Sequence, residues 1–296
     1  MKVRIGVGLG TRGDLDAARF AQAVDGLEAF GFDSLWLSER ISGDMPDPVV
    51  ALGVAAGRTT RLKLGFSVLV LPGRNPMLLT KQLVTLDRLS GGRLLPAFGL
   101  GVVEPAEQQA FGIRRGDRSA VFDELMPVVR ALWAGEVVDH DGTFTFERAR
   151  VGPRPVRPAL EVWLGGIANS EMRRCARHGD GWLPSMCLPR DVAKGIDVIR
   201  TEAAALGRRI EPDHYGAIVT YVEGPIPDDL VRSVNRRRPD LEPEELVVQG
   251  LPALRRRIQD FVGAGATKFV VVPATEPADW TAHLGELAEA VLPLQD

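Results

Sequence analysis

Ser38, Glu39 and Arg40 stand side by side where a short apolar run ends. The run is Leu35–Leu37, and Gly43 follows soon after, so the chain turns directly behind the three polar side chains. A carboxylate can carry a proton, whereas arginine stays protonated and supplies a fixed positive charge. The stretch therefore fits either a site that handles protons and negative charge or an ordinary polar loop.

Two glycine-rich segments suggest a second kind of chemistry. Gly99-Leu100-Gly101 lets the backbone approach a flat or anionic ligand, because no Cβ intervenes. Gly165-Gly166 leads to Asn169 and Ser170 at the start of an expected helix, where N–H and hydroxyl donors suit a phosphate. Both segments also fit purely structural roles, namely a glycine turn and an N-cap at Asn169 or Ser170.

The elements that must position these residues alternate between strands and helices. Apolar positions at helical spacing predict a helix with Asp14 as N-cap and a stop at Gly31. Asp47-Pro48 and Asn75-Pro76 each predict an N-cap followed by proline at the first helical position, and the second of these helices runs to Gly91. The predicted strands are Lys2–Leu9, Asp33–Leu37, Leu62–Leu71, Leu94–Phe98, Glu161–Leu164, Gly181–Leu183, Ala217–Val222 and Lys268–Val272.

This alternation predicts an α/β fold built from parallel β/α units, with strands apolar enough to be covered on both faces. The first four units take about 100 residues, so the whole chain has room for eight, which favours a (β/α)8 TIM barrel over an open sheet. We expect a single domain over residues 1–296 with irregular insertions at about 136–160 and 223–250. In such a barrel the polar residues behind the strands share one C-terminal mouth.

Composition excludes several functional classes. A net charge of −3 argues against an electrostatic nucleic-acid binder. The longest uncharged stretches, such as Leu64–Gly73, are too short to span a membrane, and the N-terminus lacks the apolar core of a signal peptide. Cys175 and Cys187 are too few for a disulfide framework, and no Cys/His spacing predicts a metal site. We expect a cytoplasmic protein with reduced cysteines.

Three segments carry a family resemblance: FDSLWLSER from residue 32, the run from Asp47 to Gly101 that ends in LLPAFGLG, and VWLGGIANSEMRRCARHGDGWLP from residue 162. Together they resemble the luciferase-like flavin monooxygenase superfamily, and most of all its branch that uses the deazaflavin coenzyme F420. The resemblance implies a (β/α)8 barrel, usually a homodimer, that transfers a hydride between F420 and a small-molecule substrate. Two alternatives stay open: a luciferase-like monooxygenase that uses flavin mononucleotide (FMN), and a non-catalytic flavin- or deazaflavin-binding protein.

The resemblance also assigns coenzyme contacts. Ser67-Val68 matches a β-bulge at which several members have a non-prolyl cis peptide, and this bulge backs the deazaflavin ring. The glycine motif at 99–101 would lie along the ring or its ribityl chain, and the segment 164–170 would hold the ribityl chain and the phosphate. The implied cofactor-binding residues are Ser67, Val68, Gly99, Leu100, Gly101, Leu164, Gly165, Gly166, Asn169 and Ser170.

Position 40 departs from the family pattern, because many deazaflavin-dependent members have histidine where this chain has Arg40. Arginine cannot act as a general base near neutral pH, whereas histidine can. Arg40 would instead stabilise negative charge on the reduced coenzyme or hold an anionic substrate, or else form a rim ion pair with Glu39 or Asp44. Glu39 and Glu104 remain the candidates for proton transfer, although Glu104 also fits the first turn of a helix.

Overall fold

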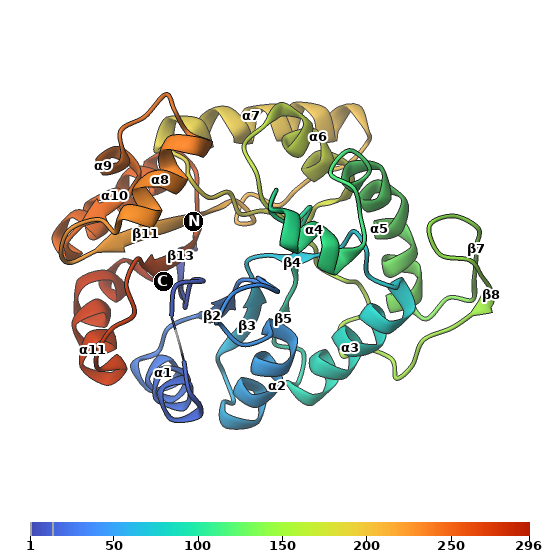
Figure 1. Ribbon diagram of the computed structural model, residues 1–296, viewed down its shortest axis with the longest axis horizontal. Helices are drawn as coiled ribbons and strands as arrows, with labels where there is room; N and C mark the ends of the chain where they lie inside the picture. The colour runs from blue at the N-terminus through green and yellow to red at the C-terminus, as the bar shows by residue number, and fades with distance from the viewer. Residues whose placement is uncertain (1, 14) are drawn as a thin grey trace.

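The computed structural model describes residues 2–13 and 15–296. Its strands form a ring surrounded by helices (Figure 1), and the pairings can be followed around that ring. β1 (Arg4–Gly8) pairs with β2 (Ser34–Leu37), β2 with β3 (Lys63–Phe66), and β3 with β5 (Leu94–Leu95). β4 (Leu69–Val70), which continues β3, pairs with β6 (Ala97–Gly99), β6 with β9 (Trp163–Leu164), and β9 with β10 (Gly181–Trp182). A parallel bridge from Trp182 to Tyr215 connects β10 to the start of β11 (Gly216–Val222), and β11 pairs with β13 (Lys268–Pro273), which returns to β1. All of these pairings are parallel, as the predicted (β/α)8 barrel requires.

The strands of the ring are β1 (Arg4–Gly8), β2 (Ser34–Leu37), β3 (Lys63–Phe66), β4 (Leu69–Val70), β5 (Leu94–Leu95), β6 (Ala97–Gly99), β9 (Trp163–Leu164), β10 (Gly181–Trp182), β11 (Gly216–Val222) and β13 (Lys268–Pro273). The surrounding helices are α1 (Ala17–Phe30), α2 (Pro48–Arg58), α3 (Pro76–Leu89), α5 (Arg118–Ala134), α6 (Asn169–His178), α7 (Pro189–Ala205), α10 (Leu251–Gly263) and α11 (Trp280–Val291), followed by a short 3-10 turn (Leu292–Leu294).

Two of the predicted strands are divided. Leu62–Leu71 becomes β3 and β4, which are separated at Ser67 and Val68. Leu94–Phe98 becomes β5 and β6, which are separated at Pro96, a residue with no N–H to give to a ladder. The division at Ser67 and Val68 coincides with the predicted β-bulge, whereas the prediction of a continuous strand was wrong at Pro96.

Of the three helix starts predicted in the first hundred residues, two follow the capping signals. Asp47 accepts the Val50 amide at 2.9 Å and Asn75 accepts the Met77 amide at 2.9 Å, so both predicted N-caps are confirmed. The first helix begins later than predicted: Asp16 is its N-cap and accepts the Arg19 amide at 2.8 Å. Asp14, the predicted N-cap of this helix, lies outside the described residues.

The barrel interior is filled by large aromatic side chains. Trp36 and Trp163 are almost fully buried there and pack with Leu95, Leu183 and Val270. A Cβ added at Gly6 or Gly65 would overlap the Trp36 indole, so these glycines make room for it. The interior is therefore a packed core, and any ligand site must lie beyond it at an end of the barrel.

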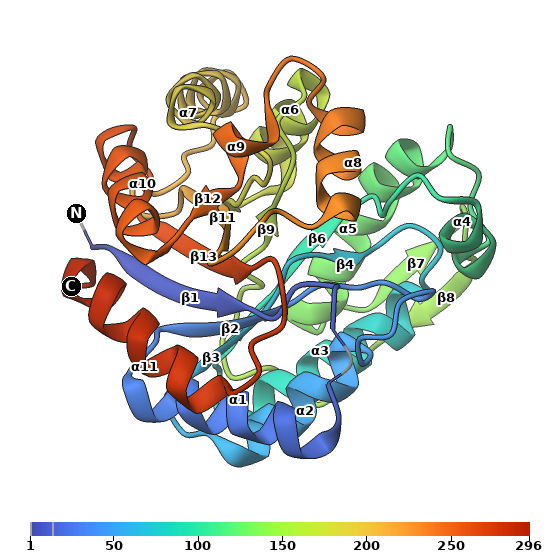
Figure 2. The same cartoon turned by 60° about the vertical axis from the view of Figure 1, so that its left-hand side comes forward.

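The two insertions are more regular than expected. Residues 136–160 contain an antiparallel strand pair, β7 (Val138–His140) and β8 (Phe146–Ala149), so the expectation of irregular structure was wrong there. Residues 223–250 contain α8 (Asp228–Arg237), α9 (Pro243–Leu246) and β12 (Val248–Gln249). Figure 2 shows α8, together with the short helix α4 (Pro105–Phe111), on the side toward which the β1 arrow points. That side is the C-terminal mouth of the barrel.

Candidate functional site

Val68 lies at the centre of the predicted cofactor-binding residues. The peptide bond between Ser67 and Val68 is cis, as predicted. A Cβ added at Gly99 would lie 2.5 Å from Val68 Cγ2, and one added at Gly165 would lie 3.9 Å from Val68 Cγ1 and 3.2 Å from the Leu183 carbonyl oxygen. The bulge between β3 and β4, the end of β6 and the segment behind β9 therefore meet around one side chain, with bare backbone on two sides of it.

The turn behind β2 supports this bulge directly. Ser38 Oγ donates to the Ser67 carbonyl oxygen at 2.8 Å and lies 3.2 Å from Ser67 Oγ. The Glu39 amide donates to the Val68 carbonyl oxygen at 3.3 Å. Ser38, which we expected only as a residue of a polar turn, thus holds the backbone next to the cis peptide.

The glycine motif behind β6 is held by hydrogen bonds from a neighbouring helix. Arg118 at the start of α5 donates Nη1 to the carbonyl oxygens of Leu100, Gly101 and Val102 at 3.3, 2.7 and 3.3 Å. Gly101 has φ +78°, a conformation that glycine adopts without strain. No feature of the sequence pointed to this role for Arg118, because only the fold brings α5 against the loop.

Glu39 is enclosed and fully engaged. Its side chain is 1% exposed, Oε2 accepts the Val70 amide at 2.8 Å, and Oε1 forms an ion pair with Arg74. Burial raises the pKa of Glu39, whereas the Arg74 charge and the Val70 hydrogen bond act in the opposite direction. This carboxylate joins the end of β2 to the loop behind β4.

Arg40 and Glu104, both predicted catalytic candidates, are in direct contact. Arg40 Nη2 donates to Glu104 Oε2 at 2.7 Å, and Arg40 Nε lies 3.7 Å from Glu107 Oε1. The partners expected for a rim ion pair, Glu39 and Asp44, were therefore wrong. Glu104 is the N-cap residue of α4, but its side chain makes no capping hydrogen bond and pairs with Arg40 instead.

Glu107 is a residue that sequence reasoning missed. It is 3% exposed and accepts the Ser42 hydroxyl at 2.6 Å and the amides of Ser42 and Ile41 at 2.9 and 3.2 Å. Burial alone would raise the pKa of Glu107, but the Ser42 bonds, the Ile41 amide and the Arg40 charge lower it overall. Glu107 thus remains ionised and fixes the loop that carries Arg40.

The N-cap of α6 is neither of the two residues that the sequence suggested. Ala168 is the N-cap residue, so the alternative that Asn169 or Ser170 caps the helix was wrong. Glu171 Oε2 accepts the Ala168 amide at 3.0 Å, and Trp182 Nε1 donates to the Gly166 carbonyl oxygen at 2.9 Å. Asn169 and Ser170 are exposed, and within the part of the chain that the structure describes their side chains make no hydrogen bond.

The second insertion adds charges to the same mouth. Arg236 of α8 has a guanidinium nitrogen 4.0 Å from Glu104 Oε1, and Asp229 at the other end of α8 pairs with Arg12 behind β1. Glu104 thus faces one arginine from the barrel and one from the insertion. No sequence signal connected residues 104 and 236, because the contact exists only when α8 folds over the strand ends.

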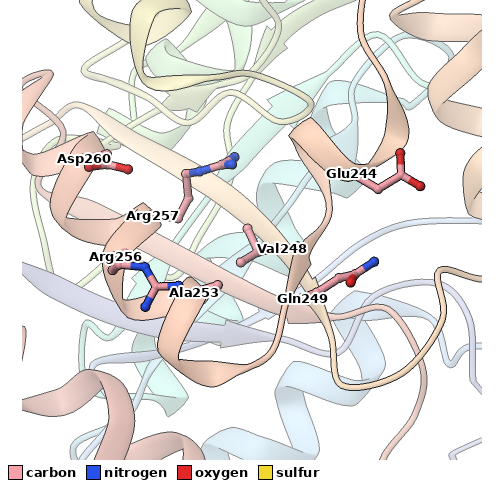
Figure 3. Close-up of a pocket in the computed structure, with 7 residues that line it drawn as sticks. All are labelled: Glu244, Val248, Gln249, Ala253, Arg256, Arg257 and Asp260. Carbon is pink, nitrogen blue, oxygen red and sulfur yellow. The ribbon is translucent and has the colours of Figure 1, made fainter.

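A surface pocket of about 320 Å³ lies elsewhere, and Figure 3 shows the side chains around it. The residues lining it are Glu244, Val248, Gln249, Ala253, Arg256, Arg257 and Asp260, none of which is a predicted site residue. Among the described residues, no group of three or more His, Cys, Asp or Glu could hold a metal ion. Within the same residues, no helix combines the length and apolar character needed to cross a bilayer.

Comparison with curated proteins gives distant relatives. An uncharacterised protein of Mycobacterium tuberculosis is 33% identical over 190 residues, which are 63% of this chain and 64% of that protein, so the match covers less than two thirds of the relative's length. A phthiodiolone/phenolphthiodiolone dimycocerosates ketoreductase of Mycobacterium kansasii is 28% identical over 207 residues, 60% of this chain and 56% of the relative.

Solved structures share the whole fold. An F420-dependent secondary alcohol dehydrogenase, determined with an F420–acetone adduct, superimposes with a TM-score of 0.81 at 17% identity and covers 100% of both chains. The oxygenating constituent of 3,6-diketocamphane monooxygenase of Pseudomonas putida, a type II Baeyer–Villiger enzyme in complex with FMN, has a TM-score of 0.79 at 17% identity and covers 99% of both chains. The sequence profile described as luciferase-like monooxygenase matches residues 1–237, and the chain therefore belongs to the luciferase-like monooxygenase family.

Proposed function

We propose that this protein is an oxidoreductase that uses coenzyme F420 and transfers a hydride between the deazaflavin and a small organic substrate. The observation that carries the proposal is the bare backbone on two sides of Val68, next to the cis peptide that it shares with Ser67. Glycines at positions 99 and 165 leave room for the Val68 side chain, so that the bulge, the end of β6 and the segment behind β9 come together where a planar ring system could lie against them. The F420-dependent enzyme of the same fold and the ketoreductase relative support this choice.

The residues present fit such a coenzyme. The bulge and the two glycine segments offer backbone to the ring, and the exposed first turn of α6 offers unpaired N–H, amide and hydroxyl groups to a phosphate. When bound, F420 supplies the hydride chemistry, and the protein supplies position and electrostatics. The residues that would hold it are Ser67, Val68, Gly99, Leu100, Gly101, Leu164, Gly165, Gly166, Asn169 and Ser170.

We assign different roles to the three catalytic candidates according to how far their side chains are exposed. Glu39, 1% exposed and paired with Arg74, positions the loop behind β4. Glu104 is 36% exposed and lies at the surface of the mouth. Arg40, 27% exposed, provides a permanent positive charge at the mouth.

Titration of the intrinsic tryptophan fluorescence with F420 and, separately, with FMN tests the coenzyme. Quenching by F420 at micromolar concentrations, without quenching by FMN, is the expected result. The reverse preference would favour an FMN-dependent monooxygenase, which the similar fold of the FMN-containing Baeyer–Villiger enzyme keeps as the second candidate. If neither coenzyme binds, both proposals are wrong.

A second experiment distinguishes an enzyme from a non-catalytic coenzyme-binding protein. The non-catalytic candidate stays open because Arg40 stands where many deazaflavin-dependent members have a histidine, which can gain and lose a proton. Reduced F420 bound to the protein is mixed with a panel of enones, ketones and imines, and its reoxidation is followed by absorbance. Reoxidation that depends on the acceptor supports the oxidoreductase. Bound coenzyme that stays reduced with every acceptor favours the non-catalytic protein.

A further inference from the structure

The surface pocket of about 320 Å³ is bounded by α9, β12 and α10. Its volume falls within the range of roughly 300–1,000 Å³ that small-molecule sites have in proteins. Glu244 on α9 and Gln249 at the end of β12 form one wall. Arg256, Arg257 and Asp260 on α10 form the other wall (Figure 3). The first wall belongs to the second insertion, and the other belongs to a helix of the barrel.

Both walls are anchored by buried apolar side chains. Leu246 of α9 is 6% exposed, and Leu254 and Ile258 of α10 are fully buried. Arg257 Nη1 also donates to the Glu245 carbonyl oxygen at 2.8 Å, so a hydrogen bond joins α10 to α9 directly. The pocket is therefore a fixed hollow between two packed elements.

The charged side chains around the pocket have few partners within the part of the chain that the structure describes. There, Arg256 forms no hydrogen bond or ion pair, and Arg257 donates only to the Glu245 carbonyl oxygen. The carboxylates of Glu244 and Asp260 are also unpaired among these residues. Arg256 and Asp260 stand four residues apart on α10, a spacing at which ion pairs often form, yet they do not pair. The pocket therefore presents two permanent cations and two carboxylates to a ligand.

We infer that this pocket binds a small zwitterion of the amino-acid type, with its carboxylate at Arg256 and Arg257 and its ammonium group at Glu244. Guanidinium groups hold carboxylates through charge-assisted hydrogen bonds, and a carboxylate accepts such bonds from an ammonium group. Val248 and Ala253 lie between the two walls and offer an apolar surface to the aliphatic part of the ligand (Figure 3). A simple anion would be repelled by Glu244, whereas a zwitterion matches the charge of both walls.

A ligand in this pocket adds a connection between the second insertion and the barrel. The same insertion carries α8, whose Arg236 lies 4.0 Å from Glu104 at the mouth. Because a ligand that binds only the folded arrangement stabilises it, the occupied pocket should hold the insertion more firmly in place. The inference does not depend on the coenzyme, since no residue of the pocket belongs to the proposed coenzyme site.

Isothermal titration calorimetry on the full chain tests the ligand class, with L-alanine, L-leucine and L-glutamate as probes. At least one of them should bind with a Kd below about 1 mM. Its N-acetyl derivative lacks the ammonium group and its α-amide lacks the carboxylate, so each should bind at least about tenfold more weakly. Failure of all three probes to bind overturns the inference. Equal binding of the N-acetyl derivative would reveal a simple anion site and would overturn it as well.

Variants test where the probe binds. Arg256→Gln and Glu244→Gln should each raise the Kd at least about tenfold, the scale of one lost charge-assisted hydrogen bond. Both side chains are exposed and unpaired among the described residues, so the melting temperature without ligand should match that of the wild type. Arg61→Gln, which removes an arginine 74% exposed and paired with Glu28, is the matched control and should keep the wild-type Kd. An unchanged Kd in both pocket variants contradicts the inference.

Hydrogen exchange measured by mass spectrometry gives a second readout. The bound probe should slow exchange of the backbone amides in residues 243–260, which contain α9, β12 and most of α10, and should leave the segment around the Ser67-Val68 bulge unchanged. Slower exchange at the bulge alone would place the probe in the proposed coenzyme site and overturn the inference. If F420 does not bind while the amino acid does, the proposed function fails and this inference stands.

Discussion

The Glu39 carboxylate and the Val70 amide are joined by a 2.8 Å hydrogen bond that links the end of β2 to the end of β4. Arg74 completes the link, because it pairs with the other oxygen of Glu39, donates Nε to the Val70 carbonyl oxygen at 2.9 Å and lies over the Phe111 ring. The loops behind β2 and β4 are thereby held together at the mouth. We therefore propose that Glu39 acts as a structural residue, in place of the proton carrier that we expected from the sequence.

We predict that Glu39→Gln lowers the free energy of unfolding by about 3–5 kcal/mol, because it leaves the Arg74 charge without its buried partner. Urea denaturation measures the loss. In a double-mutant cycle, Glu39→Gln combined with Arg74→Met should cost less than the sum of the two single changes. A variant of unchanged stability whose hydride-transfer rate falls a hundredfold or more would restore Glu39 as the proton carrier.

Replacing Gly99 by alanine should weaken coenzyme binding. The new Cβ would lie 2.5 Å from Val68 Cγ2, so either the bulge or the glycine segment must move. We expect the Kd for F420 in the fluorescence titration to rise at least about tenfold, since one tenfold step corresponds to only about 1.4 kcal/mol. Gly263→Ala in α10 is the control, because a Cβ there meets nothing within 4 Å, and its Kd should not change. An unaltered Kd in Gly99→Ala would remove the argument for ring contact at this edge.

The stability of the fold should decrease as the pH falls below about 6.5, the ordinary pKa of histidine. His283 Nε2 accepts the Tyr221 hydroxyl at 2.6 Å and Nδ1 lies 3.2 Å from Glu223, while burial lowers the pKa of His283. The unfolded chain therefore binds the proton at a higher pH than the folded chain, so stability is retained above pH ~6.5 and is lost as the pH falls toward the folded pKa.

Denaturation midpoints measured on either side of that pH test this effect. His283→Gln should reduce the difference between the two midpoints. Some of the difference should remain, because burial also lowers the pKa of His178. A pH dependence that is the same in the variant and the wild type would show that His283 contributes nothing to it.

A homodimer remains a prediction, and α2 is where we expect its interface. Val50 and Val54 are 69% and 51% exposed, and together with Gly53 and Gly57 they form an apolar stripe at helical spacing on the outer face of α2. Val54→Asp should convert a dimer to a monomer in light scattering coupled to size exclusion. Val137→Asp, a change at a valine 57% exposed outside that helix, should leave the dimer intact. A wild type that is monomeric at all concentrations would refute the homodimer prediction.

The sequence alone determined most of the scaffold. Apolar strands alternating with capped helices predicted the (β/α)8 barrel, because periodicity and caps such as Asp47 and Asn75 act within a few residues. The family resemblance predicted the cis peptide at Ser67-Val68, and the family itself was identified correctly. The errors were local: a strand that divides at Pro96, and helix starts at Ala17 and Asn169.

Only the tertiary structure decided what the polar residues of the mouth do. Two neighbours in sequence have different partners. Glu39 pairs with Arg74, whereas Arg40 pairs with Glu104, which lies 64 residues further along the chain. Glu107, Arg118 and Arg236 entered the site although no motif marked them. The physical reason is that a charge is paired by whichever partner the barrel brings within a few ångströms, and ion pairing depends on that distance and on burial, neither of which is written in the spacing of residues along the chain.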